Sequence, residues 1–410
     1  MAAFDSEQYD IDILDNGRTV RDFIDKKIEQ LSLEDCSEPF HVADLDDVYK
    51  KHLTWSENLP RVKPFYAVKC NNTPAIIRTL SALGTGFDCA SKAEIELALS
   101  LGATPDRIIF AHTTKPESHI KFARTRGVQM MTFDNQDELS KIAHCHPSAK
   151  LVLRIAVDDS SSLRRLNSKF GACPAAAGKL LRRAGELGLD VVGVSFHVGC
   201  MCNDTRNFPL KFEEIAATIN VALDEFFPPE CGVQIIAEPG RYFVESAFTL
   251  AVNVIGKRAM MEEAAEQNSN RVMMYYVNDG VFGSLSFLIN DPASGCVLPY
   301  LQKAAEGGER RYRSVIWGPT CDSIDKLTDS CLLPELQVGE WLLFDNTGAY
   351  TVCLATDFNG FEKAHIFSVV TPETWQVLQD HTSDSAGSVA VFAACDQSQT
   401  RKNPPEHCIQ

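Results

Sequence analysis

The chain has 410 residues, of which 45% are hydrophobic and 23% are charged, and its formal net charge at pH 7 is −16. This length favours two domains, or a barrel with a second lobe, and the composition excludes a disordered or fibrous protein. The negative charge opposes a nucleic-acid partner, because phosphates attract basic surfaces.

The N-terminal residues 1–12 are acidic and lack the basic segment and apolar run of a targeting peptide, so we expect a cytoplasmic protein. The best apolar run, 249–255, is too short to cross a membrane, which takes roughly 20 residues. The 14 cysteines are expected to be reduced thiols. Cys200 and Cys202 have no second pair of ligands at zinc-binding spacing, so no metal site is predicted.

Short apolar runs alternate with helical patterns between Pro64 and Gly240, which is typical of βα units around a parallel sheet. Their near-continuous apolar content predicts strands that are buried on both faces. There are seven such runs, one fewer than the eight strands of a closed barrel. The predicted strands are 65–69, 86–90, 107–111, 128–133, 150–157, 191–199 and 234–238.

From Thr249 onward, strands follow one another without long amphipathic helices, which predicts an antiparallel β lobe. Residues 40–44 are expected to join this lobe, 262–270 to form a loop tip, and the chain after about 379 to be a mobile tail. The predicted strands of the lobe are 249–254, 272–277, 314–317, 341–344, 351–355 and 365–370. We therefore divide the chain into an N-terminal segment that joins the β domain, a barrel, a β domain and a flexible tail: 1–44, 45–247, 248–380 and 381–410.

Lys69 is the first candidate for chemistry. Alternation along its predicted strand places it on one face with Phe65 and Ala67. A desolvated lysine at such a position can lose its proton and form a Schiff base with an aldehyde, which is the usual anchoring of pyridoxal phosphate. A lone lysine at a strand exit more often reaches water, so other residues must decide.

Polar residues also end the other predicted strands. Glu238 could face a pyridine nitrogen, and Gly240 and Arg241 could bind a phosphate, although a turn with an exposed ion pair is an equally good interpretation. His197 could stack on a cofactor ring, whereas a lone histidine near a core is usually only hydrogen-bonded. Two more residues lie at strand exits, where barrel enzymes place catalytic groups: Asp88 and Arg154.

Six separated motifs resemble, in order, those of the eukaryotic ornithine decarboxylase family. The resemblance extends from about residue 40 to residue 370 and is specific, because all six motifs coincide. The motifs are 64–71 with Lys69, 86–92 with Asp88, 195–199 with His197, 237–241 with Glu238, 317–322 with Cys321, and 348–350 with Tyr350.

This resemblance implies a fold-type III enzyme that uses pyridoxal 5′-phosphate. Its fold would be a TIM-like barrel, here one strand–helix unit short, with a β-sandwich or barrel-like second domain. It would work as a head-to-tail homodimer with shared active sites. Glu94 would lie near the lysine. The implied cofactor-binding residues are Lys69, Asp88, Arg154, His197, Glu238, Gly240, Arg241 and Tyr350.

The resemblance also implies catalytic and substrate-binding roles. Cys321, from the partner subunit, would protonate the carbon that loses carbon dioxide, so Lys69, His197 and Cys321 are the catalytic candidates. Asp322 and Asp291 would bind the distal ammonium group of the substrate. Phe358 would help to orient the leaving carboxylate.

One part of the family pattern is missing. Family members carry a helix and a strand with a glycine-rich phosphate loop after the His197 strand, whereas this chain has only residues 200–209 there. We therefore expect an open sheet edge or a distorted barrel, and a weaker affinity for the cofactor. We hypothesise that the sequence is a splice form or an incomplete gene model of a competent enzyme.

The sequence leaves the identity of the substrate undecided between two classes of amino acid. The first candidate is decarboxylation of L-ornithine to putrescine, in polyamine biosynthesis. Three positions depart from the family: Asp291 lacks the aromatic residue that precedes it there, Pro292 follows Asp291, and Cys200 replaces a phosphate-binding serine. A neutral substrate such as leucine is an alternative, although Asp291 and Asp322 argue for a cationic one.

A second alternative is a non-enzymatic antizyme inhibitor, which keeps the fold and binds antizyme. Residues 115–141, with Lys121, Arg124 and Arg126, resemble the antizyme-binding face. A solvated helix face would account for the same residues.

Overall fold

The computed structural model describes residues 10–202, 211–261, 271–290, 298–302 and 309–381. Three predictions lie outside this range: the loop tip at 262–270, the tail from 382 onward, and the substrate-binding role of Asp291 beside Pro292. None of the described helices is long and apolar enough to span a membrane.

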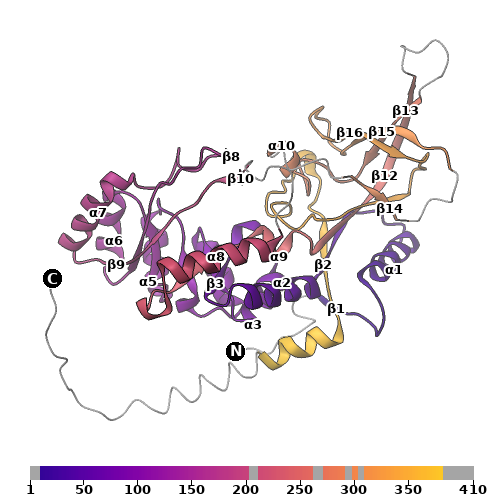
Figure 1. Cartoon of the computed structure of the whole chain (residues 1–410). Helices are drawn as coiled ribbons and strands as arrows, with labels where there is room; N and C mark the ends of the chain where they lie inside the picture. Colours follow the sequence, from indigo (N-terminus) through magenta and orange to yellow (C-terminus); the bar gives the residue numbers. More distant parts are fainter. Residues whose placement is uncertain (1–9, 203–210, 262–270, 291–297, 303–308, 382–410) are drawn as a thin grey trace.

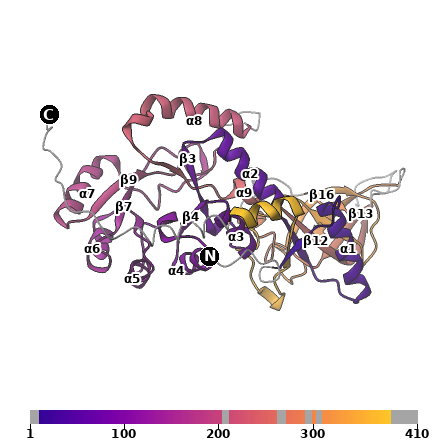
Figure 2. The ribbon, with the colours of Figure 1, turned by 90° about the horizontal axis from the view of Figure 1, so that it is seen from below.

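The first sheet consists of seven parallel strands, each followed along the chain by helical segments that lie around the outside (Figures 1 and 2). All seven predicted strands are present, and most are shorter than predicted. In sheet order they are β11 (Ile235–Ala237), β3 (Val62–Ala67), β4 (Gly86–Cys89), β5 (Ile108–Phe110), β6 (Met130–Phe133), β7 (Lys150–Arg154) and β9 (Asp190–Ser195).

Alternation along these strands builds two cores. Ile109 packs with Phe65 and Val152 on one face of the sheet, whereas Phe87 and Phe110 belong to the large core that includes the helices. This double burial explains the near-continuous apolar runs. The helices of this part are α2 (Leu45–Asn58), α3 (Pro74–Ala82), α4 (Lys92–Ser100), α5 (Glu117–Thr125), α6 (Gln136–Cys145), α7 (Pro174–Glu186), α8 (Phe212–Phe226) and α9 (Arg241–Val244).

The seven-stranded sheet is open. Within the described chain, β9 pairs only with β7 and β11 only with β3, so the barrel is one unit short and the gap is not bridged. Val194 and Phe196 beside the gap are 61% and 62% exposed, and Val221 and Phe226 of α8 are exposed as well. Such side chains are normally covered by a neighbouring strand and helix.

The second sheet contains nine strands, and residues 40–44 join it as predicted. It is mixed and not antiparallel, because β1 with β18, β18 with β2, and β13 with β15 run parallel. Its strands are β1 (Ile11–Ile13), β2 (Phe40–Asp44), β12 (Phe248–Met261), β13 (Arg271–Val277), β14 (Tyr300–Leu301), β15 (Tyr312–Trp317), β16 (Lys326–Leu333), β17 (Trp341–Phe344) and β18 (His365–Val370).

One strand prediction for this lobe is wrong, and strands β1, β14 and β16 were not predicted. Residues 351–355 form turns, and Lys326–Leu333, which was not predicted, is a strand at the edge of the sheet. Helix α1 (Val20–Leu33) packs Ile24 and Ile28 against Phe40 and Trp341. Two short strands, β8 (Ser162–Arg164) and β10 (Cys200–Cys202), pair separately, and the short helix α10 spans Phe287–Asn290.

Candidate active site

Lys69 lies just beyond the end of β3 and not within it. The strand stops at Ala67, whose N–H donates to Pro239 O at 3.0 Å, and a single 3₁₀ turn, η2 (Val68–Cys70), carries the lysine. Val68 and Cys70 are fully buried, whereas the side chain of Lys69 is 42% exposed. The turn therefore points Lys69 out of the core at the carboxyl end of the sheet, where barrel enzymes place their active sites.

Lys69 donates a hydrogen bond to Oδ2 of Asp88, a buried residue of β4. Burial alone would lower the pKa of Lys69, but the Asp88 and Glu238 carboxylates hold that pKa above its ordinary value. Burial raises the pKa of Asp88, and Lys69 opposes this effect. Lys69 is therefore a paired cation, in contrast to the neutral amine that its sequence environment suggested.

Buried polar atoms beside this pair have no hydrogen-bond partner among the described residues. They are Oδ1 of Asp88, Nε and Nη2 of Arg154, and Oγ of Ser195. Arg154 ends β7, and its guanidinium lies 5.0 Å from the ring centre of Phe170. Because burying unpaired polar groups is costly, their concentration at one end of the sheet indicates a site for a polar ligand.

Glu238 and His197 belong to the same electrostatic cluster. Desolvation and the negative charge of Asp88 raise the pKa of Glu238 to about 7, while Lys69 and Arg154 act in the opposite direction. The Gly199 N–H donates to Nδ1 of His197 at 3.0 Å, so the neutral imidazole carries its proton on Nε2. Burial and the charge of Arg154 lower the pKa of His197.

The remaining cofactor candidates meet at Cys70, next to Lys69. A Cβ added to Gly240 would lie 2.9 Å from Cβ of Cys70, so the close approach requires glycine. Tyr350 donates its N–H to Cys70 O at 2.9 Å, and its ring lies 5.6 Å from the Arg241 guanidinium. Arg241 pairs with Glu245 at 2.5 Å. Gly240, Arg241 and Tyr350 thus form one side of the site.

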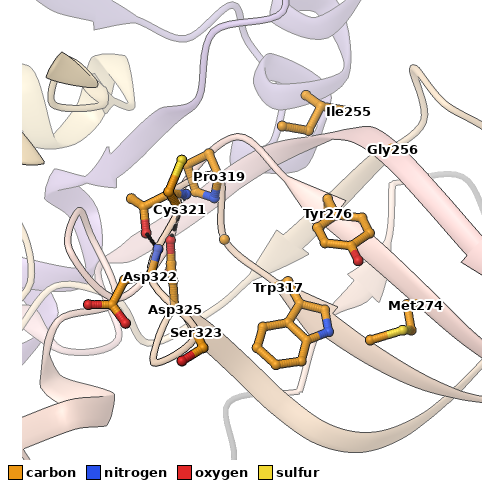
Figure 3. A pocket seen from close by; sticks show the side chains of 12 residues that line it. Ile255, Gly256, Met274, Tyr276, Trp317, Pro319, Cys321, Asp322, Ser323 and Asp325 are labelled. Carbon is orange, nitrogen blue, oxygen red and sulfur yellow. Dashed lines mark hydrogen bonds between the residues drawn. The ribbon is translucent and has the colours of Figure 1, made fainter. Parts of the chain in front are cut away.

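Cys321 and Asp322 lie elsewhere, on the exposed loop between β15 and β16. They line a cavity of about 510 Å³ together with Trp317 and Tyr276 (Figure 3). In the described part of the chain, no hydrogen bond, ion pair or aromatic contact joins them to the Lys69 cluster. Phe358 is exposed too, and its ring lies 4.5 Å from that of Phe282. The candidate residues therefore form two separate groups in one chain.

Sequence reasoning missed two residues of the site. Ser195 precedes His197 by two positions, so strand alternation could have placed it on the same face. Glu245 follows Arg241 by four positions, the spacing at which helical ion pairs form. Glu94, expected near the lysine, accepts a hydrogen bond from the Ala90 N–H at 2.6 Å, and burial raises its pKa.

Comparisons with known proteins identify one family. The family model described as "Pyridoxal-dependent decarboxylase, pyridoxal binding domain" matches residues 45–209 and 205–245. Ornithine decarboxylase of Rattus norvegicus is 48% identical over 92% of this chain and 91% of its own length. Antizyme inhibitor 2 of Xenopus laevis is 44% identical over 91% of this chain and 90% of its own.

Two solved structures are similar over most of the chain. The Paramecium bursaria Chlorella virus arginine decarboxylase bound to agmatine has a TM-score of 0.77 and 32% identity, over 85% of this chain and 100% of that chain. The Vibrio vulnificus lysine/ornithine decarboxylase complexed with putrescine has a TM-score of 0.72 and 28% identity, over 85% and 97%.

The parallel sheet with a lysine at its carboxyl end, joined to a mixed β domain, defines the class of pyridoxal-phosphate-dependent decarboxylases. The chain belongs to the family of these decarboxylases that contains the ornithine decarboxylases and antizyme inhibitors. Pyridoxal phosphate is the cofactor of this family, and the unpaired atoms of Asp88 and Arg154 fit such a ligand. The family match is in two parts that overlap at residues 205–209, within the segment where the sequence predicts that a strand–helix unit is missing.

Proposed function

We propose that this chain binds pyridoxal phosphate at Lys69 and decarboxylates a basic L-amino acid, with L-ornithine as the first candidate. The observation that carries this proposal is the Lys69–Asp88 pair with unpaired buried atoms of Asp88 and Arg154 around it. The identity of 48% with the Rattus norvegicus ornithine decarboxylase supports the same substrate. Putrescine would be the product.

Each residue around Lys69 has a separate task. When bound, pyridoxal phosphate supplies a ring that accepts the electrons left by the departing carboxylate. Glu238 would hold a proton at the ring nitrogen, and His197 would pack against the ring. The Lys69 amine would hold the cofactor covalently through its aldehyde group. Gly240, Arg241 and Tyr350 would hold the phosphate.

The second group of residues acts across the interface of a head-to-tail homodimer. The Cys321 thiol donates a proton to the carbon that has lost carbon dioxide, and Phe358 orients the carboxylate before it leaves. Asp322 and Asp291 pair with the distal ammonium group. A leucine side chain would leave these carboxylates without a partner, which disfavours a neutral substrate.

A substrate panel tests this function. The purified chain is saturated with pyridoxal phosphate, and carbon dioxide release is measured from L-ornithine, L-lysine, L-arginine and L-leucine. We expect release from a basic amino acid, with L-ornithine first. A preference for L-leucine would overturn the cationic substrate, and no release from any amino acid would overturn the enzymatic function.

Antizyme binding without catalysis is a second candidate function. The similarity to the Xenopus laevis antizyme inhibitor 2 favours it, as does the missing phosphate loop. Lys115, however, is buried and bonded to Glu138, so it does not belong to a binding face. Lys121 and Arg126 are exposed ion-pair partners at α5. An antizyme pull-down beside the substrate panel separates binding from catalysis.

A further inference from the structure

The loop that carries Cys321 has no buried side chain of its own between residues 321 and 324. A proton donor must be held close to the reacting carbon, because a displacement of about 1 Å is enough to slow an enzymatic step. Some other part of the chain must therefore fix the thiol. The contacts of this loop identify two residues that do so.

The first anchor is Asp325, the buried residue that ends the loop (Figure 3). Its Oδ2 accepts from the Thr320 N–H at 2.9 Å, and its Oδ1 accepts from the Val281 N–H at 2.9 Å. Its main chain closes the loop, since its carbonyl accepts from the Gly318 N–H at 2.8 Å and its N–H donates to Asp322 O at 3.1 Å. One carboxylate thus ties the Cys321 loop to a second loop near residue 281.

Two glycines make room for this carboxylate. A Cβ added to Gly318 would lie 2.1 Å from Oδ1 of Asp325, and one added to Gly280 would lie 2.2 Å from the same atom. Any larger residue at either position would displace the carboxylate. The backbone of both loops therefore accommodates the Asp325 carboxylate, and this close fit distinguishes the contact from a chance one.

The second anchor is Asn359, whose Oδ1 accepts from the Cys321 N–H at 3.1 Å. Asn359 lies in the turn η5 (Phe358–Gly360) and has a φ of 58°, which asparagine tolerates better than most residues. Its neighbour Phe358 packs on Phe282, which follows Val281 directly. These contacts connect the three segments: Asp325 bonds to the loop with Phe282, Phe282 packs on the turn with Asn359, and Asn359 bonds to Cys321.

We propose that Asp325 and Asn359 are positioning residues that hold the Cys321 thiol for proton transfer to the substrate carbon. This inference rests on the proposed decarboxylase function, in which carbon dioxide leaves first and the Cys321 proton then completes the amine. Asp325 and Asn359 do not touch the reacting atoms. They determine where the proton donor lies.

Amide hydrogen exchange of the ligand-free chain tests the anchors without any activity. Asp325→Asn replaces one acceptor oxygen by an NH₂ group, and Asn359→Gly removes its acceptor while keeping the positive φ accessible. Peptides that contain residues 320–321 should exchange about fivefold faster in each variant. Asn359→Asp keeps an acceptor oxygen, so the same peptides should exchange as slowly as they do in the wild-type chain. Asp329→Asn changes an exposed aspartate on strand β16, which begins directly after Asp325, and is the matched control.

The amine formed per carbon dioxide released tests the proton transfer itself. This ratio is one when every decarboxylated substrate is protonated at its own carbon. A misplaced thiol lowers the ratio, because a proton delivered to the cofactor carbon instead would, after addition of water, leave the amino nitrogen on the cofactor and release the rest of the substrate as an aldehyde. We expect a fall in Asp325→Asn and Asn359→Gly, recovery in Asn359→Asp, and no change in Asp329→Asn.

These outcomes separate the two proposals. Wild-type protein that releases no carbon dioxide from any amino acid overturns the decarboxylase function. Active wild-type protein whose ratio and amide exchange are unaltered by Asp325→Asn and Asn359→Gly overturns the positioning roles. Asn359→Gly keeps the second test valid in case Asp325→Asn does not fold.

Discussion

Lys69 and Asp88 differ sharply in solvent exposure although they share one hydrogen bond. The carboxylate is buried, whereas the lysine side chain is 42% exposed. The sequence predicted both residues at strand exits but suggested a neutral amine at Lys69, because the charge state depends on which side chains the strand order brings together. Asp88 lies on the neighbouring strand β4. Desolvation is the largest single influence on the pKa of Lys69, and the charge and hydrogen bond of Asp88 together with the charge of Glu238 outweigh it.

Replacing Lys69 should separate charge from covalent anchoring. Lys69→Met leaves the buried Asp88 without its partner and should lower the free energy of unfolding by about 1–2 kcal/mol, less than for a fully buried pair. Lys69→Arg keeps the charge and should keep most of the stability. Both variants should lose activity at least about a hundredfold.

Urea unfolding measures the stability of the two variants, and borohydride reduction followed by peptide mass analysis locates the cofactor. The cofactor should be trapped on the Lys69 peptide of wild-type protein and absent from both variants. Trapping on another lysine would contradict the anchor.

The raised pKa of Glu238 predicts a pH-dependent stability. The pKa is about 7 in the folded chain against 4.5 ordinarily, so between these values the folded state binds more protons than the unfolded state. Stability should therefore fall as the pH rises from about 4.5 to about 7. Glu238→Gln should remove this fall and gain about 1 kcal/mol at pH 8, a figure reduced for solvent screening.

Urea unfolding of the ligand-free chain at several pH values checks the Glu238 prediction, with the exposed Glu230→Gln as control. No difference should remain near pH 4.5. A difference that stayed constant with pH would show that Glu238 does not titrate in this range.

At the scale of elements, the two sheets differ in how well sequence patterns predicted them. Burial on both faces gave the seven parallel strands an apolar signal. Strand β16 was missed because it is an edge strand with exposed polar residues such as Asp329. Residues 351–355 are rich in β-branched residues, yet Tyr350 has a φ of 57° and Thr351 Oγ1 bonds to Thr347 O, so the chain turns there.

The open edge at β9 predicts surface behaviour that a closed barrel would lack. Val194 is exposed, so Val194→Lys should change the free energy of unfolding by less than about 0.5 kcal/mol while reducing aggregation and binding of a hydrophobic dye. Val191 of the same strand packs against the core, and Val191→Lys should destabilise the chain by about 1–3 kcal/mol. Equal effects on stability would contradict the open edge.

At the scale of the whole molecule, the candidate residues fall into two groups, and within the described part of one chain no hydrogen bond, ion pair or aromatic contact connects them. The sequence motifs identified both groups, because each motif is local. Which subunit supplies each group could not be read from the residues themselves, since it depends on how two folded surfaces meet. The homodimer with shared sites is a proposal that accounts for the separation.

Subunit mixing tests the shared sites. Lys69→Ala and Cys321→Ala variants should each be inactive or strongly impaired. If each site takes Lys69 from one subunit and Cys321 from the other, random mixing yields about half mixed dimers, each with one intact site. Activity should recover to about a quarter of the wild-type value. Activity that did not recover, although mass analysis showed mixed dimers, would place both residues in the same subunit.

Strand β11 is three residues long, and β3 is its one partner within the described chain. A short strand held from one side is among the first parts of a fold to open in native-state hydrogen exchange. Glu238, Gly240 and Arg241 follow it directly, so three of the residues proposed to hold the cofactor belong to a segment that should open early. A ligand that binds only the closed form shifts this equilibrium by mass action. Binding of the cofactor and closing of the β11 segment onto β3 would then occur together. The cofactor would support this segment on the side where no strand of the described chain pairs with it.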